Sequence, residues 1–418
     1  MRERLVLLFG LLVILPSMVI GQSKTSTSPY SAFGVGDLFV PASIRQVGMA
    51  RIGQAISEPA NLNAANPASA AEVFRFTFDF YAFYQSTRLQ TESAQTRLEN
   101  ASLGGMNLVF KKTTPLAFTL GLNPYSGVGY DFALERTLPD DTGLTPFRSN
   151  RSGSGGLNMG YVGGAYQFFK GRLSAGAQVN YLFGNVSRQW FTQVGRLEAV
   201  GVLSDLRYQG VGYRVGLLAN DSLKWIGKET IGRVGLTFES LPNLSIRDLT
   251  RFETPQGLDT LVPDTRRRAT LPTRWGAGFS IQKVGKYTLA LDYLRQDWSN
   301  FGETAERGSL RAWQRVAVGG EYMPDYLAYR QLWKRVAYRA GAFYEQTYIQ
   351  LQGQSIDQWG LTGGLGIPIS FQTVSRLHVG VEWSQRGTQS AGLIAEQNLR
   401  LFLGISFVEP WFRPRKYD

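Results

Sequence analysis

Apolar and polar residues alternate along most of the chain between residues 73 and 407. In the first such segment every second residue from 74 to 80 is phenylalanine, while Arg75 and Asp79 stand between them. Because successive side chains of a β-strand point to opposite faces, this period of two predicts strands with one apolar and one polar face. About fourteen such segments follow one another, an even number that suits a single-chain barrel. The fold class expected is therefore all-β.

Three features favour a membrane barrel over a soluble β-sandwich, which also alternates. The apolar faces end in Tyr, Trp or Phe, whose rings suit the headgroup layer of a bilayer. The opposite faces mix glycine with charged residues, which a dry sandwich core would hold only at a high desolvation cost. Short connections such as 111–115, 169–172 and 283–286 alternate with long polar ones such as 85–100, 135–153 and 248–268. The chain is thus predicted to be a transmembrane antiparallel β-barrel of about 14 strands in the bacterial outer membrane, with short periplasmic turns and long outer loops.

Composition supports this class and excludes others. The chain has 47 Gly, 19 Tyr, 25 Phe and 9 Trp, and only 18% of its residues are charged, below the roughly 25% of soluble domains. The formal charge of +12 comes from Lys and Arg scattered through the chain, so nucleic-acid binding is not expected. The absence of cysteine excludes disulfides, thiolate catalysis and cysteine-ligated metal sites.

The two ends of the chain differ from the barrel segments. Residues 1–21 combine Arg2 and Arg4 with an apolar run and small residues, which predicts a secretory signal peptide. The predicted barrel covers residues 73–407. Residues 408–418 are basic and aromatic, and we expect them to form a periplasmic C-terminal tail.

Residues 22–72 lack the alternation and are rich in proline and small residues. A ring of about fourteen strands encloses a bore wide enough to need filling, so we expect this segment to plug it. Phe33, Leu38 and Phe39 are candidate contacts for a hydrophobic ligand above the plug. The alternative interpretation is that these three side chains simply pack against the wall.

A second candidate site is an interruption of the third predicted strand. Proline has no amide hydrogen to donate to a neighbouring strand, and every strand of a closed barrel has two neighbours. Pro124, with Asn123, Tyr125, Gly127 and Gly129 around it, therefore predicts a bulge or a lateral gap in the wall. The alternative is that Pro124 lies at the outer rim, where pairing has already ended.

Two motifs resemble the FadL-type transporters of long-chain fatty acids and aromatic hydrocarbons. The triplet Asn66-Pro67-Ala68, directly before the first aromatic strand, is similar to the Asn-Pro-Ala signature of that family's hatch. The stretch 120–130 resembles the family's interrupted strand. The resemblance implies that Asn66, Pro67 and Ala68 fix the hatch. It also implies that a ligand leaves sideways through the strand gap into the membrane.

Residues 28–37 and 411–418 resemble FadL-like proteins from gliding, protein-secreting bacteria. In related bacteria such barrels also serve as plugs or accessory subunits of larger outer-membrane machines. A tail beyond the last predicted strand departs from a self-contained transporter. The resemblance therefore implies either transport or an accessory role.

Catalytic chemistry is not expected. The only histidine, His378, lies on the inward face by its parity, where we expect it to form a polar pair with Glu382. No metal-ligand spacing is present, so we expect no enzymatic activity, metal site or cofactor. The polar residues expected to line the bore are Arg75, Asp79, Arg214, Arg339, His378 and Glu382.

Two functions fit these sequence features. The first is passive uptake of a hydrophobic small molecule, with outer-membrane lipid around the barrel and lateral exit at Pro124. The second is a non-transporting accessory or plug barrel of a larger secretion or assembly complex. In the second, the tail and the longer periplasmic links 220–229 and 324–334, each with Trp and basic residues, would bind periplasmic or outer-membrane proteins. The alternative for these links is that they are ordinary interfacial anchors.

Overall fold

The computed structural model describes residues 26–74, 76–111, 115–140, 143–227, 229–254, 257–301, 310–328, 330–351, 353–369 and 374–409. The predicted signal peptide, Arg75 and residues 410–418 of the predicted tail lie outside these ranges.

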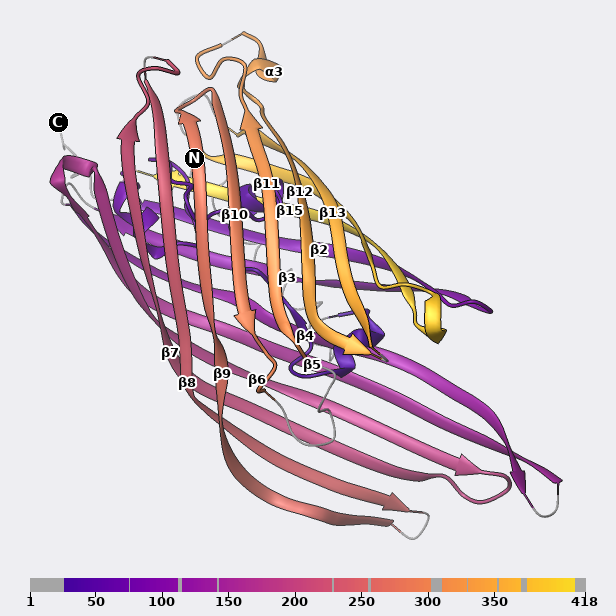
Figure 1. Cartoon of the computed structure of the whole chain (residues 1–418). Coiled ribbons are helices and arrows are strands. Elements are labelled where there is room, and N and C mark those ends of the chain that lie inside the picture. Colours follow the sequence, from indigo (N-terminus) through magenta and orange to yellow (C-terminus); the bar gives the residue numbers. More distant parts are fainter. Residues whose placement is uncertain are drawn as a thin grey trace, which may run out of the picture.

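Fourteen strands within the described residues, β2 to β15, form a closed antiparallel barrel (Figure 1). Each strand pairs with its sequence neighbours, and β15 closes the ring against β2. The predicted barrel of about 14 strands is confirmed. The strands are β2 (Phe76–Gln90), β3 (Gln95–Lys111), β4 (Leu116–Asp140), β5 (Gly143–Phe168), β6 (Leu173–Val194), β7 (Val200–Ser222), β8 (Thr230–Thr254), β9 (Gly257–Lys283), β10 (Tyr287–Asp297), β11 (Ala312–Tyr322), β12 (Ala337–Leu351), β13 (Gln354–Pro368), β14 (Arg376–Arg386) and β15 (Ala395–Glu409).

The two faces of the wall have the polarity that a bilayer requires. On β10, Leu289 and Leu291 are 60% and 50% exposed, whereas Asp292 between the strand's apolar positions is buried. The same inversion occurs on β7, where Val215 and Leu217 are exposed and Arg214 is buried. Apolar groups that face outward around a closed ring are stable only in lipid. The chain is therefore a transmembrane barrel of the outer-membrane type.

Among the described residues, helical structure is confined to short turns. They are η1 (Pro29–Ala32), α2 (Ile44–Val47), η2 (Pro67–Glu72), η3 (Phe169–Gly171), α3 (Leu332–Arg335) and η5 (Ser390–Gly392). In the part of the chain that the structure describes, no helix has both the length and the hydrophobicity to cross a membrane.

Three connections at one end of the barrel are short, as predicted, whereas residues 323–336 between β11 and β12 form a longer link at the same end. The turns β3–β4, β5–β6 and β9–β10 occupy the positions predicted from the sequence. This end, with α3, lies toward the top and the upper left of Figure 1. The start of β2 and the end of β15 also lie here, side by side, and this end is taken as the periplasmic one, as the sequence predicted.

The prediction of long outer loops is wrong. The stretches 85–100, 135–153 and 248–268 are strands for almost their whole length. Strands β4 to β9 have 22 to 27 residues, against 11 in β10, β11 and β14. They form a tall wall on one side of the outer end, toward the lower right of Figure 1. Both faces of this extension lie beyond the lipid, so neither has to be apolar throughout, and the period of two is weak in these three stretches.

Candidate functional site

Residues 26–72, here called the N-terminal segment, are bonded to inward-facing groups of many strands. Ion pairs and hydrogen bonds connect this segment to β2, β7, β10, β11, β14 and β15. It contains η1, the two-residue strand β1 (Asp37–Leu38), α2 and η2. Most of its side chains are buried. This arrangement fits the predicted plug, although its role as a hatch stays a prediction.

A buried ion-pair network joins α2 to the periplasmic half of the wall. The Arg45 Nη2 atom lies 2.9 Å from carboxylate oxygens of both Glu321 and Glu58. Glu321 also pairs with Arg339 at 2.6 Å, and Arg339 contacts His378 Nδ1 at 2.7 Å. Burial works against the charge of Arg45, but Glu321 and Glu58 together raise its pKa. Glu321 is therefore the carboxylate that holds two buried arginines in place.

The expected polar pair between His378 and Glu382 is wrong. His378 Nε2 lies 2.8 Å from Ser406 Oγ, whereas Glu382 binds Arg51 of the N-terminal segment and Arg400. Side chains four residues apart on a strand are about 13 Å apart along it. Each therefore finds partners on neighbouring strands and on the N-terminal segment.

Two inward-facing carboxylates accept backbone hydrogen bonds from the N-terminal segment. Asp79 accepts from Ile44 N at 3.2 Å. Asp292 accepts from Gly53 N at 2.6 Å and from Gln54 N at 2.9 Å. The carboxylates satisfy amide hydrogens of a segment that has little secondary structure of its own.

Arg214, a further bore residue predicted from its inward parity, joins a strand to the N-terminal segment. Its Nε donates to Glu239 at 2.6 Å. Its Nη1 donates to the Ala64 carbonyl at 3.2 Å. The guanidinium thus links β7 to the segment just before η2.

Asn66, Pro67 and Ala68 form the start of η2 against the wall. Asn66 Oδ1 accepts from Ala68 N at 3.0 Å and caps the helix, and Pro67 occupies its first turn. Asn66 Nδ2 donates to the carbonyls of Gln54 at 2.7 Å and Leu217 at 3.1 Å. One side chain therefore holds η2, the preceding loop and β7 together.

Replacing Asn66 with alanine is expected to destabilise the protein by about 2 kcal/mol, since it removes a helix cap and leaves buried carbonyls without a donor. The measurement is the urea unfolding midpoint of the refolded protein in detergent micelles. The matched control is Asn150→Ala, at an exposed position of β5. Equal midpoints for the two variants would show that the Asn66 contacts contribute nothing.

The ladder between β3 and β4 is interrupted at the position predicted from Pro124. Pairing runs from Lys111↔Ala117 to Met106↔Leu122 and then stops, although β4 continues in register with β5 to Asp140. Tyr125 is bulged out of the β4–β5 ladder. We call the unpaired stretch between the two strands the seam.

The N-terminal segment bonds to the edge of β4 that β3 leaves free. In β1, Asp37 pairs with Gly127 and Leu38 pairs with Ser126, and Phe39 N donates to the Tyr125 carbonyl at 2.9 Å. Further along, Gly129 N donates to Ser31 Oγ at 3.0 Å. The segment thus takes the place of a neighbouring strand.

Around the seam little space remains. Asn123 is buried and donates to Asn107 Oδ1 at 2.8 Å. A cavity of about 10 Å³ lies between Pro124, Gly104 of β3 and Phe39. Phe39 packs on Phe83 with ring centroids 6.2 Å apart. The seam is therefore filled by side chains in this conformation.

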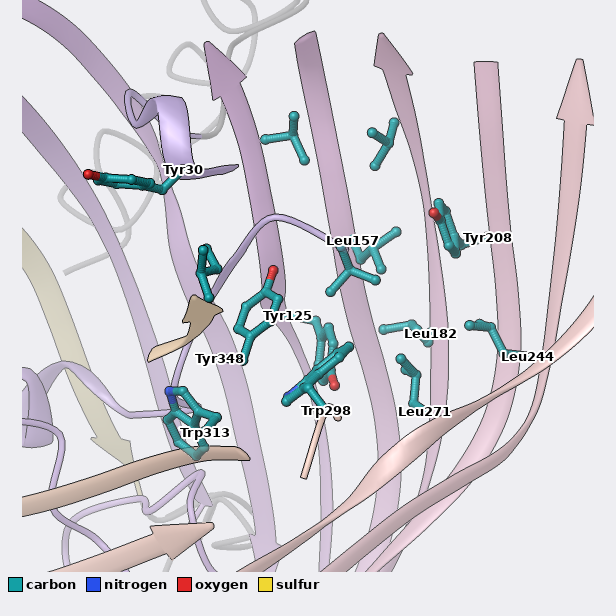
Figure 2. Packing of buried hydrophobic residues seen from close by; sticks show 14 of the residues in the cluster. Tyr30, Tyr125, Leu157, Leu182, Tyr208, Leu244, Leu271, Trp298, Trp313 and Tyr348 are labelled. Atoms are coloured by element: carbon teal, nitrogen blue, oxygen red, sulfur yellow. The ribbon is translucent and has the colours of Figure 1, made fainter. Parts of the chain in front are cut away.

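A large buried cluster, here called the inner apolar cluster, joins Tyr30, Val35 and Val40 of the N-terminal segment to inward-facing residues of β4 to β9 and of later parts of the chain such as Trp298 and Tyr348. Figure 2 shows Tyr208 and Leu244 at one side of it and Tyr125, Trp298 and Tyr348 toward the other. Trp298 and Tyr348 stack with centroids 4.9 Å apart. Phe33 and Leu38 are partly buried against this cluster. Their packing here fits the wall-packing interpretation, and contact with a ligand stays a prediction.

Tyr30 attaches the start of the N-terminal segment to the outer end of the barrel. Its hydroxyl donates to the Ile394 carbonyl at 2.7 Å, and the Arg386 guanidinium lies 5.2 Å from its ring centroid. Burial raises the pKa of Tyr30 to about 12. The hydroxyl therefore stays protonated and donates at physiological pH.

Above the N-terminal segment, the tall wall encloses a cavity of about 620 Å³, here called the bowl. This volume lies within the range of small-molecule sites, about 300–1,000 Å³. Apolar side chains of β6 to β9 provide much of its lining, with Gly34 of the segment below. Residues that line it include Trp190, Val202, Leu206, Tyr208, Ile246, Ala269 and Phe301.

Sequence reasoning missed the cations of the N-terminal segment. Arg45 and Arg51 bind Glu321 and Glu382 across the bore, and Asp37 binds Arg386 at 2.6 Å. The sequence did contain an indication of these ion pairs, namely charged residues in a segment that is otherwise small and apolar. Buried charges need partners of opposite charge. Their partners could not be assigned without the tertiary structure.

Solved structures with this fold include a hydrocarbon channel, a toluene transporter and a FadL homologue. The CymD monoaromatic hydrocarbon channel is 16% identical, with a TM-score of 0.57 over 88% of this chain and 98% of its own. The Ralstonia pickettii toluene transporter TbuX is 15% identical, with a TM-score of 0.56 over 89% and 98%. A Pseudomonas aeruginosa FadL homologue is 13% identical, with a TM-score of 0.59 over 89% and 99%. The FadL-like fold predicted from the sequence motifs is confirmed.

Sequence comparison gives a second result. No curated protein matches this sequence. A family model described as BamG matches residues 1–418. Since that match spans the whole sequence, the chain belongs to the BamG family.

Proposed function

We propose that the barrel is a passive channel for hydrophobic small molecules, which enter at the outer end and leave sideways into the membrane. The observation that carries this proposal is the continuity of the inner apolar cluster. Its members Leu206, Tyr208 and Ile246 line the bowl, and Val40 and Tyr125 of the same cluster lie beside the seam. A hydrophobic molecule that moves along the inner apolar cluster does not cross the buried ion pairs below it.

Movement of the N-terminal segment is the step that transport requires. The cavity at the seam is about 10 Å³, close to the space of a single water. Phe39 and the β1 strand would have to withdraw from the β4 edge before a ligand could pass. That edge is held by few backbone hydrogen bonds, so its opening is less costly than opening of the barrel wall.

The names of the structural neighbours agree with this ligand class. CymD is described as a monoaromatic hydrocarbon channel and TbuX as a toluene transporter. Their identity to this chain is low, so the ligand class is proposed here on the apolar side chains of the bowl, which lie beside charged ones such as Arg188 and Asp248, together with the shared fold. Transport of this kind needs no catalytic group and no cofactor.

Replacing Leu206 and Tyr208 together with alanine is expected to weaken binding of toluene by roughly tenfold, because apolar contact area in the bowl is lost. The measurement is equilibrium binding of radiolabelled toluene to the purified protein. The control is Gln209→Ala, an exposed position on the same strand. If neither the unmodified protein nor the control binds toluene or a second probe, oleate, the channel proposal fails.

The second candidate function, an accessory barrel, is favoured by one observation. The bore is crossed by buried ion pairs, and the cavity beside Arg51, Arg315 and Arg386 is about 50 Å³ and lined largely by charge. A plug bonded in this way suits a barrel whose role is to support other proteins. Trp225 and Trp333 at the periplasmic turns are 83% and 59% exposed, which suits either a partner or the lipid interface.

Affinity purification before and after deletion of residues 410–418 tests this candidate, because stoichiometric partners lost with the tail would support it.

A further inference from the structure

Three arginines stand side by side on the outer face of the tall wall. Arg207 of β7 pairs directly with Arg247 of β8, and Arg247 pairs directly with Arg266 of β9. Residues opposite each other in antiparallel strands point to the same face. All three side chains are exposed. We call this set the arginine row.

The row lies on the outer face of the wall, opposite the bowl. Tyr208 and Ile246, one position away from Arg207 and Arg247, point inward and line the bowl. Side chains of successive residues alternate between faces, so the arginines point away from the barrel axis. Their ligand would therefore come from the surroundings of the barrel and not from the bore.

The height of the row above the lipid-facing band can be estimated on β7. Val211, Tyr213, Val215 and Leu217 are 41% to 51% exposed and face the lipid. Arg207 is four residues beyond Val211, about 13 Å along the strand and about 10 Å along the membrane normal at the usual strand tilt. A phospholipid headgroup layer is only about 5–8 Å thick. The row is therefore at the level of a bulkier headgroup.

Electrostatics favours an anionic ligand. Like charges directly opposite each other on neighbouring strands are destabilising. Asp264 offsets part of this charge, since its Oδ1 accepts from Arg247 Nε at 2.8 Å. With three arginines and one carboxylate, the row and Asp264 together keep a net positive charge. Nearby Arg251 is paired with Asp205 at 2.8 Å.

We propose that the arginine row binds the phosphates of a phosphorylated glycolipid in the outer leaflet. Guanidinium groups bind phosphate through two parallel hydrogen bonds, which a lysine cannot reproduce. Neighbouring strands are about 4.8 Å apart, so the three side chains span about 10 Å, room for more than one phosphate. A sugar headgroup also reaches the height at which the row lies. This site is independent of the channel proposal, because it is on the opposite face of the wall from the bowl.

The test uses the full chain in lipid nanodiscs of phosphatidylcholine doped with diphosphorylated lipid A. Native mass spectrometry after mild detergent extraction counts the lipid A molecules retained. The triple variant Arg207→Gln, Arg247→Gln, Arg266→Gln is expected to lower lipid A occupancy by roughly tenfold. The corresponding triple lysine variant, which keeps the charge, is expected to be intermediate.

The matched control removes three other exposed arginines, Arg97, Arg136 and Arg148, on β3 to β5. It is expected to retain lipid A as the unmodified protein does, and heat-modifiable mobility on gels checks that every variant is folded. Equal retention by the row variant and the control would overturn the proposal. Equal retention of dephosphorylated lipid A, or stronger retention of phosphatidylglycerol than of lipid A, would overturn it as well.

Discussion

Replacing Glu321 with alanine is expected to destabilise the barrel by about 3–5 kcal/mol, the usual effect of removing one partner of a buried ion pair. Arg45 and Arg339 are both at most 4% exposed in their side chains and share this carboxylate. Without it, two buried guanidinium charges lie close together, and α2 loses its main contact with β11. We therefore also expect the N-terminal segment to loosen, so that single channels in planar bilayers conduct small ions more often.

The control for this variant is Glu135→Ala. Glu135 pairs with Arg148 at 2.7 Å, but both side chains are more than half exposed. Exposed ion pairs contribute little to stability, so its unfolding midpoint and its conductance are expected to match those of the unmodified protein. A Glu321→Ala barrel with unchanged midpoint and conductance would mean that the network does not hold the N-terminal segment.

Replacing Gly36 with valine is expected to detach β1 from β4. Gly36 has φ +95°, a conformation that a β-branched residue adopts only with strain, and a Cβ there would collide with the Gly127 carbonyl. We expect a loss of at least about 2 kcal/mol in the stability of this contact. The seam would then open more often, because Phe39 and Leu38 lose their backbone partners on β4.

The absence of cysteine makes the measurement of seam opening simple. A Leu38→Cys substitution introduces a single thiol in β1, and its reaction rate with a water-soluble maleimide reports withdrawal from the β4 edge. The rate is expected to rise at least roughly tenfold in the Gly36→Val background. Gly353→Val is the control, since Gly353 also has a positive φ but has nothing near its Cβ position. Equal rates in the two backgrounds would show that Gly36 does not govern the seam.

Much of the wall could be predicted because its signal is local. Lipid on one side of a strand requires apolar side chains, and the polar bore on the other side accepts polar ones. The polarity of Leu289 and of Asp292 therefore assigns each to the lipid or the bore, and no contact partner has to be known. The break at Pro124 is equally local, since a missing amide hydrogen belongs to the residue itself. Beyond the bilayer this signal disappears, and for that reason the pattern predicts loops where the structure has the tall hairpins of β4 to β9.

By itself the sequence determined the class of fold, the approximate strand number, the inward face of residues such as Arg214 and His378, and Pro124 as a place where strand pairing is irregular. Only the tertiary structure decided which groups meet across the bore: Arg45 with Glu321, Arg51 with Glu382, and β1 with the free edge of β4. These contacts join residues tens to hundreds of positions apart. Their geometry depends on how a ring of strands closes around an irregular segment, which no local pattern records.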